Sequence, residues 1–270
     1  MTSCCQSSPR PFSTESASKQ TGCSTSKLVQ GIAGQPFPGR GVLVENLDTP
    51  LAVLRRTIPT PLQEFPVFAY IVKTVKFTGR QFVQLGSGPN FQGDCITLCT
   101  CKHKDRASPP KDGCRGTTNP DDPWEGAWVA GLCSPSQVRP RGLFYLMLVE
   151  RTFESHAACW YGLNQPSAKS AHRDPYGDIY EPLPGAETAP WSAVSYMAHL
   201  PGHRHDPSGR EKDIEVSYHG RHPRLLVGEP KRSYLWTAPH ITLIPAVDDD
   251  WTTAHHRFLP QLRGFLGDLT

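Results

Sequence analysis

No long apolar segment occurs in the sequence. A run of about 18 apolar residues, which would indicate a membrane-spanning helix, is found nowhere along the chain. The first residues, MTSCCQSSPRPFSTES, are polar and rich in Ser and Pro, and therefore lack the apolar core of a secretory signal. The sequence predicts no membrane partner and an intracellular protein, cytoplasmic or nuclear, whose thiols are reduced.

A large charge of either sign is also missing. The chain has 28 Lys and Arg residues against 25 Asp and Glu, and its formal net charge is +3. This excess is too small to identify a nucleic-acid partner by itself. We find no Gly-rich phosphate loop, no nucleophile elbow and no His-Glu-x-x-His pattern. The sequence accordingly predicts no cofactor and no metal site, and its composition leaves the function open.

Long stretches with helical spacing are missing as well, and turn-forming residues are frequent, with 27 Pro and 23 Gly. Strand-like segments dominate instead, and the segment ESHAACWYGL favours a short helix. The strand-like segments are VFAYIVKTVKF, CITLCTC, WEGAWVAGLCS, RGLFYLMLVERTF and one or two strands within RLLVGEPKRSYLWTAPHITLIP. We therefore predict a β-rich α+β fold, a small barrel or a mixed sheet with a few short helices.

Composition divides the chain into four parts. Residues 1–30 are Ser, Thr, Gln and Lys with few apolar residues, which predicts a disordered N-terminal tail. Residues 31–64 are transitional, and residues 65–247 hold most of the strand-like segments. Residues 248–270 favour a short helix that docks on the core.

Cysteines are concentrated near the middle of the chain, where Cys95, Cys99, Cys101 and His103 lie within nine positions of one another. In a strand, side chains on the same face are about 7 Å apart. Two sulfurs on one zinc ion must lie within about 4 Å of each other. The pattern therefore favours a half-buried strand that uses small thiols for packing. A metal- or thiol-dependent protein centred on Cys99, Cys101 and His103 is the alternative.

The order of the segments resembles the second of the nucleotide modification associated domain families. The resemblance covers about residues 65–245 and departs from the family pattern at Ala127, where the family has an acid, and at His103, where it has Pro. The matching positions are Thr97, Leu98, Thr100, Cys101, Lys102, Arg106, Gly126, Trp128, Val129, Gly131, Leu143, Tyr145, Met147, Trp160, Tyr176, Gly177, Asp178, Ile179, Tyr180, Tyr234 and Trp236.

The resemblance implies a nucleic-acid-associated domain linked to DNA base modification, and a weaker likeness implies a PUA-like barrel. A nucleotide or a modified base would stack in an aromatic-lined pocket. Lys102 and Arg106 would hold a phosphate. The pocket residues expected from the matching positions are Cys101, Trp128, Tyr145, Trp160, Tyr176 and Tyr180.

An enzyme that acts on a base or a nucleotide is the alternative within the same context. The loop HRDPYGDIY contains His172 and Asp178, which would act as an acid/base pair. Residues 199–222 are rich in His, but Pro201, Gly202 and Pro207 disfavour the helix that would align the imidazoles on a metal. We interpret that stretch as a solvated loop.

Overall fold

The computed structural model describes most of the chain from residue 45 onward. The described residues are 35–36, 45–85, 89–91, 96–108, 122–134, 139–163, 170–173, 176–199, 209–251 and 256–270. The predicted disordered tail, residues 1–30, lies outside them. Within these ranges no helix has both the length and the apolar character that crossing a membrane requires.

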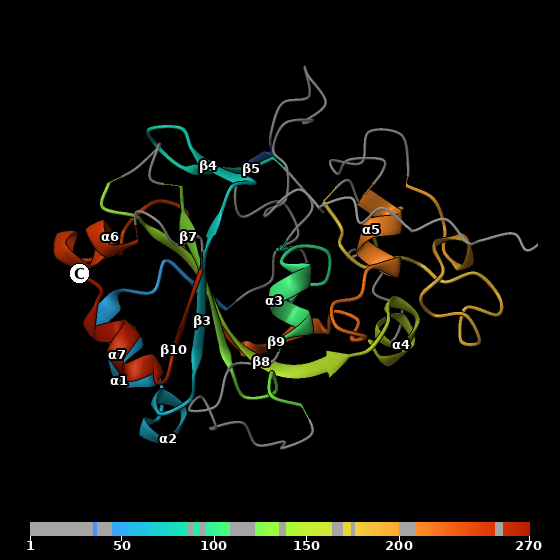
Figure 1. Ribbon diagram of the computed structural model, residues 1–270. Coiled ribbons are helices and arrows are strands. Elements are labelled where there is room, and N and C mark those ends of the chain that lie inside the picture. Colours follow the sequence, from blue (N-terminus) through green and yellow to red (C-terminus); the bar gives the residue numbers. More distant parts are fainter. Residues whose placement is uncertain are drawn as a thin grey trace, which may run out of the picture.

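A mixed sheet of seven strands forms the centre of the molecule (Figure 1). Its strands, in spatial order, are β10 (His256–Leu259), β3 (Val67–Val72), β7 (Trp128–Cys133), β8 (Leu143–Phe153), β9 (Leu225–Leu235) and β2 (Asn46–Leu47), with β6 (Thr97–Leu98) also paired to β9. The β3–β7 and β2–β9 pairs are parallel and the other pairs are antiparallel. Of the two predicted β-rich architectures, the structure has the mixed sheet.

A smaller sheet contains β1 (Gln35–Pro36), β5 (Phe82–Gln84) and β4 (Val75–Phe77), in that order. The sequence predicted one continuous strand over residues 67–77, and this is wrong. The chain bends at Lys73 and Thr74, so that β3 stays in the large sheet and β4 pairs with β5 in the small one. Val75 and Phe82 are fully buried against the core, and this apolar burial stabilises the bent conformation.

Helices lie on both sides of the large sheet (Figure 1). One group contains α1 (Leu51–Thr57), α2 (Thr60–Gln63), α6 (Pro245–Asp250) and α7 (Leu262–Gly267). The other contains α3 (His103–Ala107), α4 (His156–Gly162) and α5 (Gly209–Glu215), with the 3-10 turn η3 (Ala193–Ser195) packed near α5. Helix α4 confirms the short helix predicted in this region, and the hydroxyl of Ser155 caps it by accepting a hydrogen bond from the Ala158 amide at 3.2 Å.

The C-terminal segment contributes more than the predicted helix. Strand β10 pairs antiparallel with β3, and α7 follows it. The guanidinium of Arg55 on α1 donates to the carbonyls of Leu266 and Leu269 at 2.6 and 2.9 Å. These bonds join α1 to the C-terminal end of the chain, where α7 leaves carbonyls without helical partners.

Alternation along the strands separates the core into two clusters. On β3, Phe68 and Tyr70 face one cluster, whereas Val67 and Ala69 face the cluster that also contains residues of α1 and α7. This is the two-residue period of a strand with both faces covered. The same alternation divides β7 and most of β8 between the two faces, except that Phe144 and Tyr145 share one cluster where the β7–β8 register shifts.

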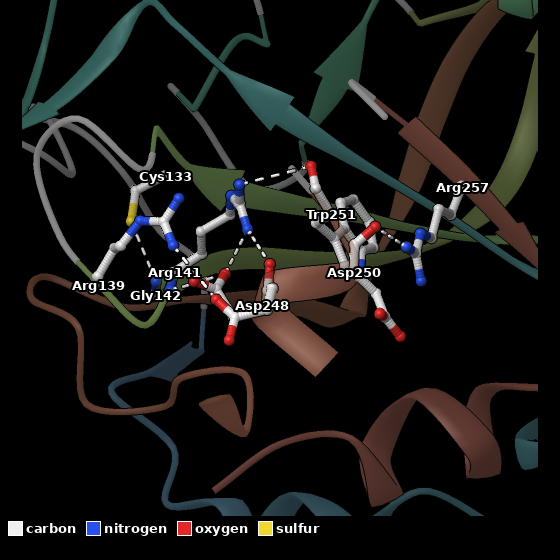
Figure 2. A network of polar contacts seen from close by, with 9 residues as sticks. Cys133, Arg139, Arg141, Gly142, Asp248, Asp250, Trp251 and Arg257 are labelled. Atoms are coloured by element: carbon white, nitrogen blue, oxygen red, sulfur yellow. Dashed lines mark hydrogen bonds and ion pairs between the residues drawn. The ribbon is translucent and has the colours of Figure 1, made fainter. Parts of the chain in front are cut away.

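A buried ion pair connects the β7–β8 connection to α6 (Figure 2). The guanidinium of Arg141 donates to the carboxylate of Asp248 and, at 2.7 Å, to the Asp248 carbonyl. The Arg141 amide also donates to the same carboxylate at 3.3 Å. Both residues are at most 2% exposed, so each buried charge is neutralised by the other and not by water.

Candidate functional site

The cysteine-rich segment is a short strand followed by a helix, and the predicted strand over residues 95–103 is wrong. Strand β6 ends at Leu98, and Lys102 takes a left-handed conformation with φ of 59° before α3 begins. Cys99 and Cys101 pack in different hydrophobic clusters as a result. Cys95 lies outside the described residues. The strand geometry that would align these thiols on one face is therefore not formed.

Arg106 has a structural position and not the predicted phosphate-binding one. Its Nε donates to the carbonyl of Cys101 at 2.7 Å, its Nη2 to that of Cys99 at 2.9 Å, and its Nη1 to that of Arg224. The residue is 1% exposed. Burial lowers the pKa of Arg106, while nearby Cys99, Cys101, Asp213 and Asp178 act in the opposite direction. These bonds hold the chain between β6 and α3 and leave the guanidinium no access to a ligand.

Asp178 is fully buried behind β6. Its Oδ1 accepts from the hydroxyl of Thr97 at 2.7 Å and its Oδ2 from the Cys99 amide at 2.9 Å. Burial raises the pKa of Asp178 from 3.8 to about 6, and the hydrogen bonds from Thr97 and Cys99 oppose this rise. The carboxyl group thus anchors the loop that carries it to the sheet.

We predict that Asp178→Asn changes the pH dependence of stability. A carboxyl group with a raised folded-state pKa stabilises the fold when protonated, and this contribution is lost as the pH rises from about 4 to about 6. The rise of about 2 pKa units corresponds to about 3 kcal/mol. Asparagine cannot ionise and can still accept from the Cys99 amide and donate to the hydroxyl of Thr97, so the variant should lose this slope. Urea unfolding at about pH 4, 5, 6 and 7 measures it.

Asp249→Asn serves as the control, because the Asp249 side chain is 74% exposed. It should follow the wild-type pH profile. If Asp178→Asn has the same slope as the wild type between pH 4 and 6, Asp178 does not titrate in this range.

The predicted acid/base pair of His172 and Asp178 is not assembled. The Nδ1 of His172 lies 2.9 Å from the hydroxyl of Ser170, and its Nε2 lies 3.0 Å from Oε2 of Glu181. Burial lowers the pKa of His172, Glu181 raises it and Arg173 lowers it. His172 and Asp178 therefore hydrogen-bond to different partners, and Ser170, which is fully buried, is closed to a ligand.

Two of the predicted pocket aromatics lie on opposite faces of the sheet. The indole of Trp128 donates to the Leu62 carbonyl at 2.8 Å in the cluster beside α1 and α7. The hydroxyl of Tyr145 donates to that of Tyr70 at 2.8 Å in the other cluster, which also contains Cys101. Their assignment to one pocket is wrong, because the strand period directs them to different sides.

The other predicted aromatics are also mostly buried. Trp160 and Tyr176 are each 6% exposed, and Tyr180 is fully buried. The guanidinium of Arg173 lies over the Trp160 ring, 5.5 Å from its centre. A base could not stack on these rings without displacing their present neighbours.

A chain of hydrogen bonds joins α3 to α5 instead. Nε2 of His103 lies 2.7 Å from Oδ1 of Asp213, and the hydroxyl of Tyr180 donates to Oδ2 of Asp213 at 3.0 Å. The same hydroxyl lies 3.1 Å from Nε2 of His199. Because the hydroxyl has one hydrogen, it accepts from His199. We call His103, Asp213, Tyr180 and His199 the His103–Asp213 cluster.

Burial differs across the cluster. The side chain of Asp213 is fully buried, whereas that of His103 is 12% exposed. His156 borders the cluster, with its ring 4.9 Å from that of Tyr180 and its Nδ1 accepting from the Tyr180 amide at 3.2 Å. Burial lowers the pKa of His156 to about 3, so that it is neutral. His103 is therefore the imidazole that connects the buried carboxylate to the surface.

Cations lie next to His103. Lys102 is partly exposed, with its Nζ 5.1 Å from the centre of the Tyr70 ring and 3.9 Å from a carboxylate oxygen of Asp105. Lys104 is exposed on α3. Of the two cations predicted to hold a phosphate, Lys102 is partly exposed and Arg106 is buried.

Asp213 was not predicted as a site residue, and the predicted solvated loop over residues 199–222 is wrong where α5 forms. Residues 209–215 form α5, in which Asp213 and Ile214 are buried. The only local signal was an isolated Ile among charged residues, which is too short to indicate an amphipathic helix. His203 and His205 of the same His-rich stretch lie outside the described residues.

The metal- or thiol-dependent alternative gains no support from these side chains. Within the part of the chain that the structure describes, no three His, Cys, Asp or Glu side chains are grouped to hold a metal ion. Cys99 lies beside the thiol of Cys159, and His103 binds Asp213.

Comparisons with protein-family models, with curated proteins and with solved structures give no match. We therefore infer the function from the geometry of the described residues.

Proposed function

We propose that the chain binds a nucleotide or a nucleic-acid base at the His103–Asp213 cluster and acts on it by acid/base chemistry. The observation that carries the proposal is the hydrogen bond between the partly exposed His103 and the fully buried Asp213. A buried carboxylate that accepts from one imidazole nitrogen fixes the tautomer and stabilises the imidazolium ion. The other nitrogen, Nδ1, then takes a proton from a ligand or returns it.

Two further contacts keep Asp213 ready to accept from His103. The hydroxyl of Tyr180 occupies the second carboxylate oxygen, and His199 in turn donates to that hydroxyl. These bonds hold the carboxylate in one orientation and compensate part of the cost of its burial. Asp213 is thus held in a fixed orientation toward His103, as the partner of a general base should be.

The choice of ligand follows from the cations and from the family resemblance. Lys102 and Lys104 lie on either side of His103 in the sequence and supply point charges suited to a phosphate. The resemblance to nucleotide modification associated domains adds the context of base modification, and the PUA-like likeness stays a prediction. A nucleotide would bind with its phosphate near these lysines and its reacting group near His103.

The experiment incubates the purified chain with nucleotides and with modified and unmodified oligonucleotides. Binding is followed by calorimetry, and products by mass spectrometry. We expect His103→Gln to lower any turnover by about 100-fold or more with little change in affinity, and Lys102→Ala to weaken binding. Lys76→Ala, at the exposed position of β4, is the matched charge control. Full turnover by His103→Gln would disprove the acid/base role, and the absence of binding to every ligand would disprove the proposed function.

A further inference from the structure

Trp191 differs from every other tryptophan of the chain in its exposure. All six tryptophans lie in described residues. Trp191 is 43% exposed, whereas the other five are between 0% and 6% exposed. A single exposed apolar side chain is common on protein surfaces. The contacts of Trp191 therefore have to show whether it can bind a ligand.

The exposed indole is held in a fixed orientation by two contacts. Its ring stacks on the imidazole of His222, with 4.5 Å between centres and 6° between planes. Its Nε1 donates to the Glu154 carbonyl at 3.4 Å. His222 is held in turn, because its Nδ1 donates to the Val216 carbonyl at 3.0 Å. We call Trp191 and His222 the aromatic platform.

One arginine is connected to the aromatic platform through Glu154, and a second adjoins the platform in the sequence. Arg224 binds the carboxylate of Glu154 at 2.9 Å, and the carbonyl of the same Glu154 holds the indole. Arg221 is exposed and directly precedes His222. An exposed planar ring held in one orientation is a surface on which a base can stack.

Helix α5 connects the aromatic platform to the His103–Asp213 cluster. Oε1 of Glu215, at the end of α5, accepts from the Ala193 amide at 2.9 Å, two residues after Trp191. Asp213 lies two residues earlier on the same helix and binds His103. Ala193, Ile214 and Tyr180 also share one buried cluster. The two sites therefore share one rigid support.

We propose that the aromatic platform stacks a base of a single-stranded nucleic acid, so that the ligand of this protein is an oligonucleotide and not a free nucleotide. This inference rests on the proposed function. The base adds a third parallel layer to the Trp191–His222 stack. Since every base has a flat face, the platform tolerates any sequence, and selectivity stays with the His103–Asp213 cluster.

The test measures the affinity of a fluorescein-labelled single strand of about ten nucleotides by anisotropy, and that of a mononucleotide by calorimetry. We expect Trp191→Ala to weaken oligonucleotide binding by about 10-fold and Trp191→Phe by less, because phenylalanine still offers a ring. Mononucleotide affinity should not change. Tyr161→Ala is the matched control, since Tyr161 is an exposed aromatic residue, at 52%, on α4.

The outcomes separate the two proposals. If the wild type binds mononucleotides and oligonucleotides but Trp191→Ala binds oligonucleotides as well as the wild type does, the aromatic platform is disproved and the proposed function stands. A loss of mononucleotide affinity in Trp191→Ala would also overturn the inference, because Trp191 would then belong to the nucleotide site. If the wild type binds neither ligand, both proposals fail. Unchanged thermal unfolding of the variants shows that folding is not responsible.

Discussion

Replacing Arg106 with methionine is expected to lower the free energy of unfolding by about 4 kcal/mol. The guanidinium donates to the buried carbonyls of Cys99 and Cys101 and to the partly buried carbonyl of Arg224. Methionine fills much of the same space but donates no hydrogen bond, and each buried carbonyl left without a donor costs about 1 to 3 kcal/mol. The loss also removes the cation that lies near the buried carboxylates of Asp178 and Asp213. Urea unfolding at neutral pH measures the effect.

The variant Arg106→Lys tests whether the charge or the hydrogen-bonding geometry of Arg106 stabilises the fold. Arg106→Lys keeps the charge, but an ammonium group cannot span three carbonyls as the planar guanidinium does. It should therefore also be destabilised, by about half as much. Lys104→Ala, on the exposed side of α3, should change stability by less than about 0.5 kcal/mol. A loss below about 1 kcal/mol for Arg106→Met would mean that these bonds contribute little to stability.

Replacing Asp248 with alanine is expected to cost about 3 to 5 kcal/mol, because Arg141 would become an uncompensated buried charge. The carboxylate accepts from both the guanidinium and the backbone amide of Arg141 (Figure 2). The remaining carbonyls of Asp248 and Trp251, at 2.7 and 3.5 Å, cannot neutralise the guanidinium. Calorimetric unfolding should show a melting temperature lower by roughly 10 °C.

A neighbouring ion pair provides the control. Arg139 and Asp249 lie 3.4 Å apart and their side chains are 52% and 74% exposed. Arg139→Ala should change stability by at most about 1 kcal/mol, because water screens an exposed pair. The double variant Arg141→Met with Asp248→Leu should lose less than Asp248→Ala alone, since it leaves no unpaired charge. If Arg139→Ala and Asp248→Ala lowered the free energy of unfolding equally, burial would not determine how much an ion pair contributes to stability.

Some of the fold could be predicted from short sequence patterns, because strands depend on residues that are close in the chain. The apolar segment LFYLMLVERTF became β8 over residues 143–153, and the helix α4 began at the Ser155 cap. Where one segment contributes strands to two sheets, the local sequence pattern cannot predict where the first strand ends. Residues 67–77 are uniformly strand-forming, and only the packing of Val75 and Phe82 explains the bend between β3 and β4.

The candidate site was predicted only in part. Tyr180 and Lys102 were among the expected residues, and both lie at the His103–Asp213 cluster or beside it. Asp178 and His172 lie only six positions apart in the sequence, but they hydrogen-bond to different partners. Asp213 could not be predicted, because His103 and Asp213 are 110 positions apart and a carboxylate in a short charged helix has no local signature.

The sequence by itself determined the β-rich class, the positions of the main strands and the short helix after β8, since each depends on the period and propensity of neighbouring residues. Only the tertiary structure decided what the polar and aromatic side chains do. It buried Arg106 among carbonyls, divided Trp128 and Tyr145 between two faces, and exposed Trp191. These outcomes depend on contacts between segments that are distant in the sequence. The resulting burial then determines how much each charged or aromatic side chain stabilises or destabilises the fold.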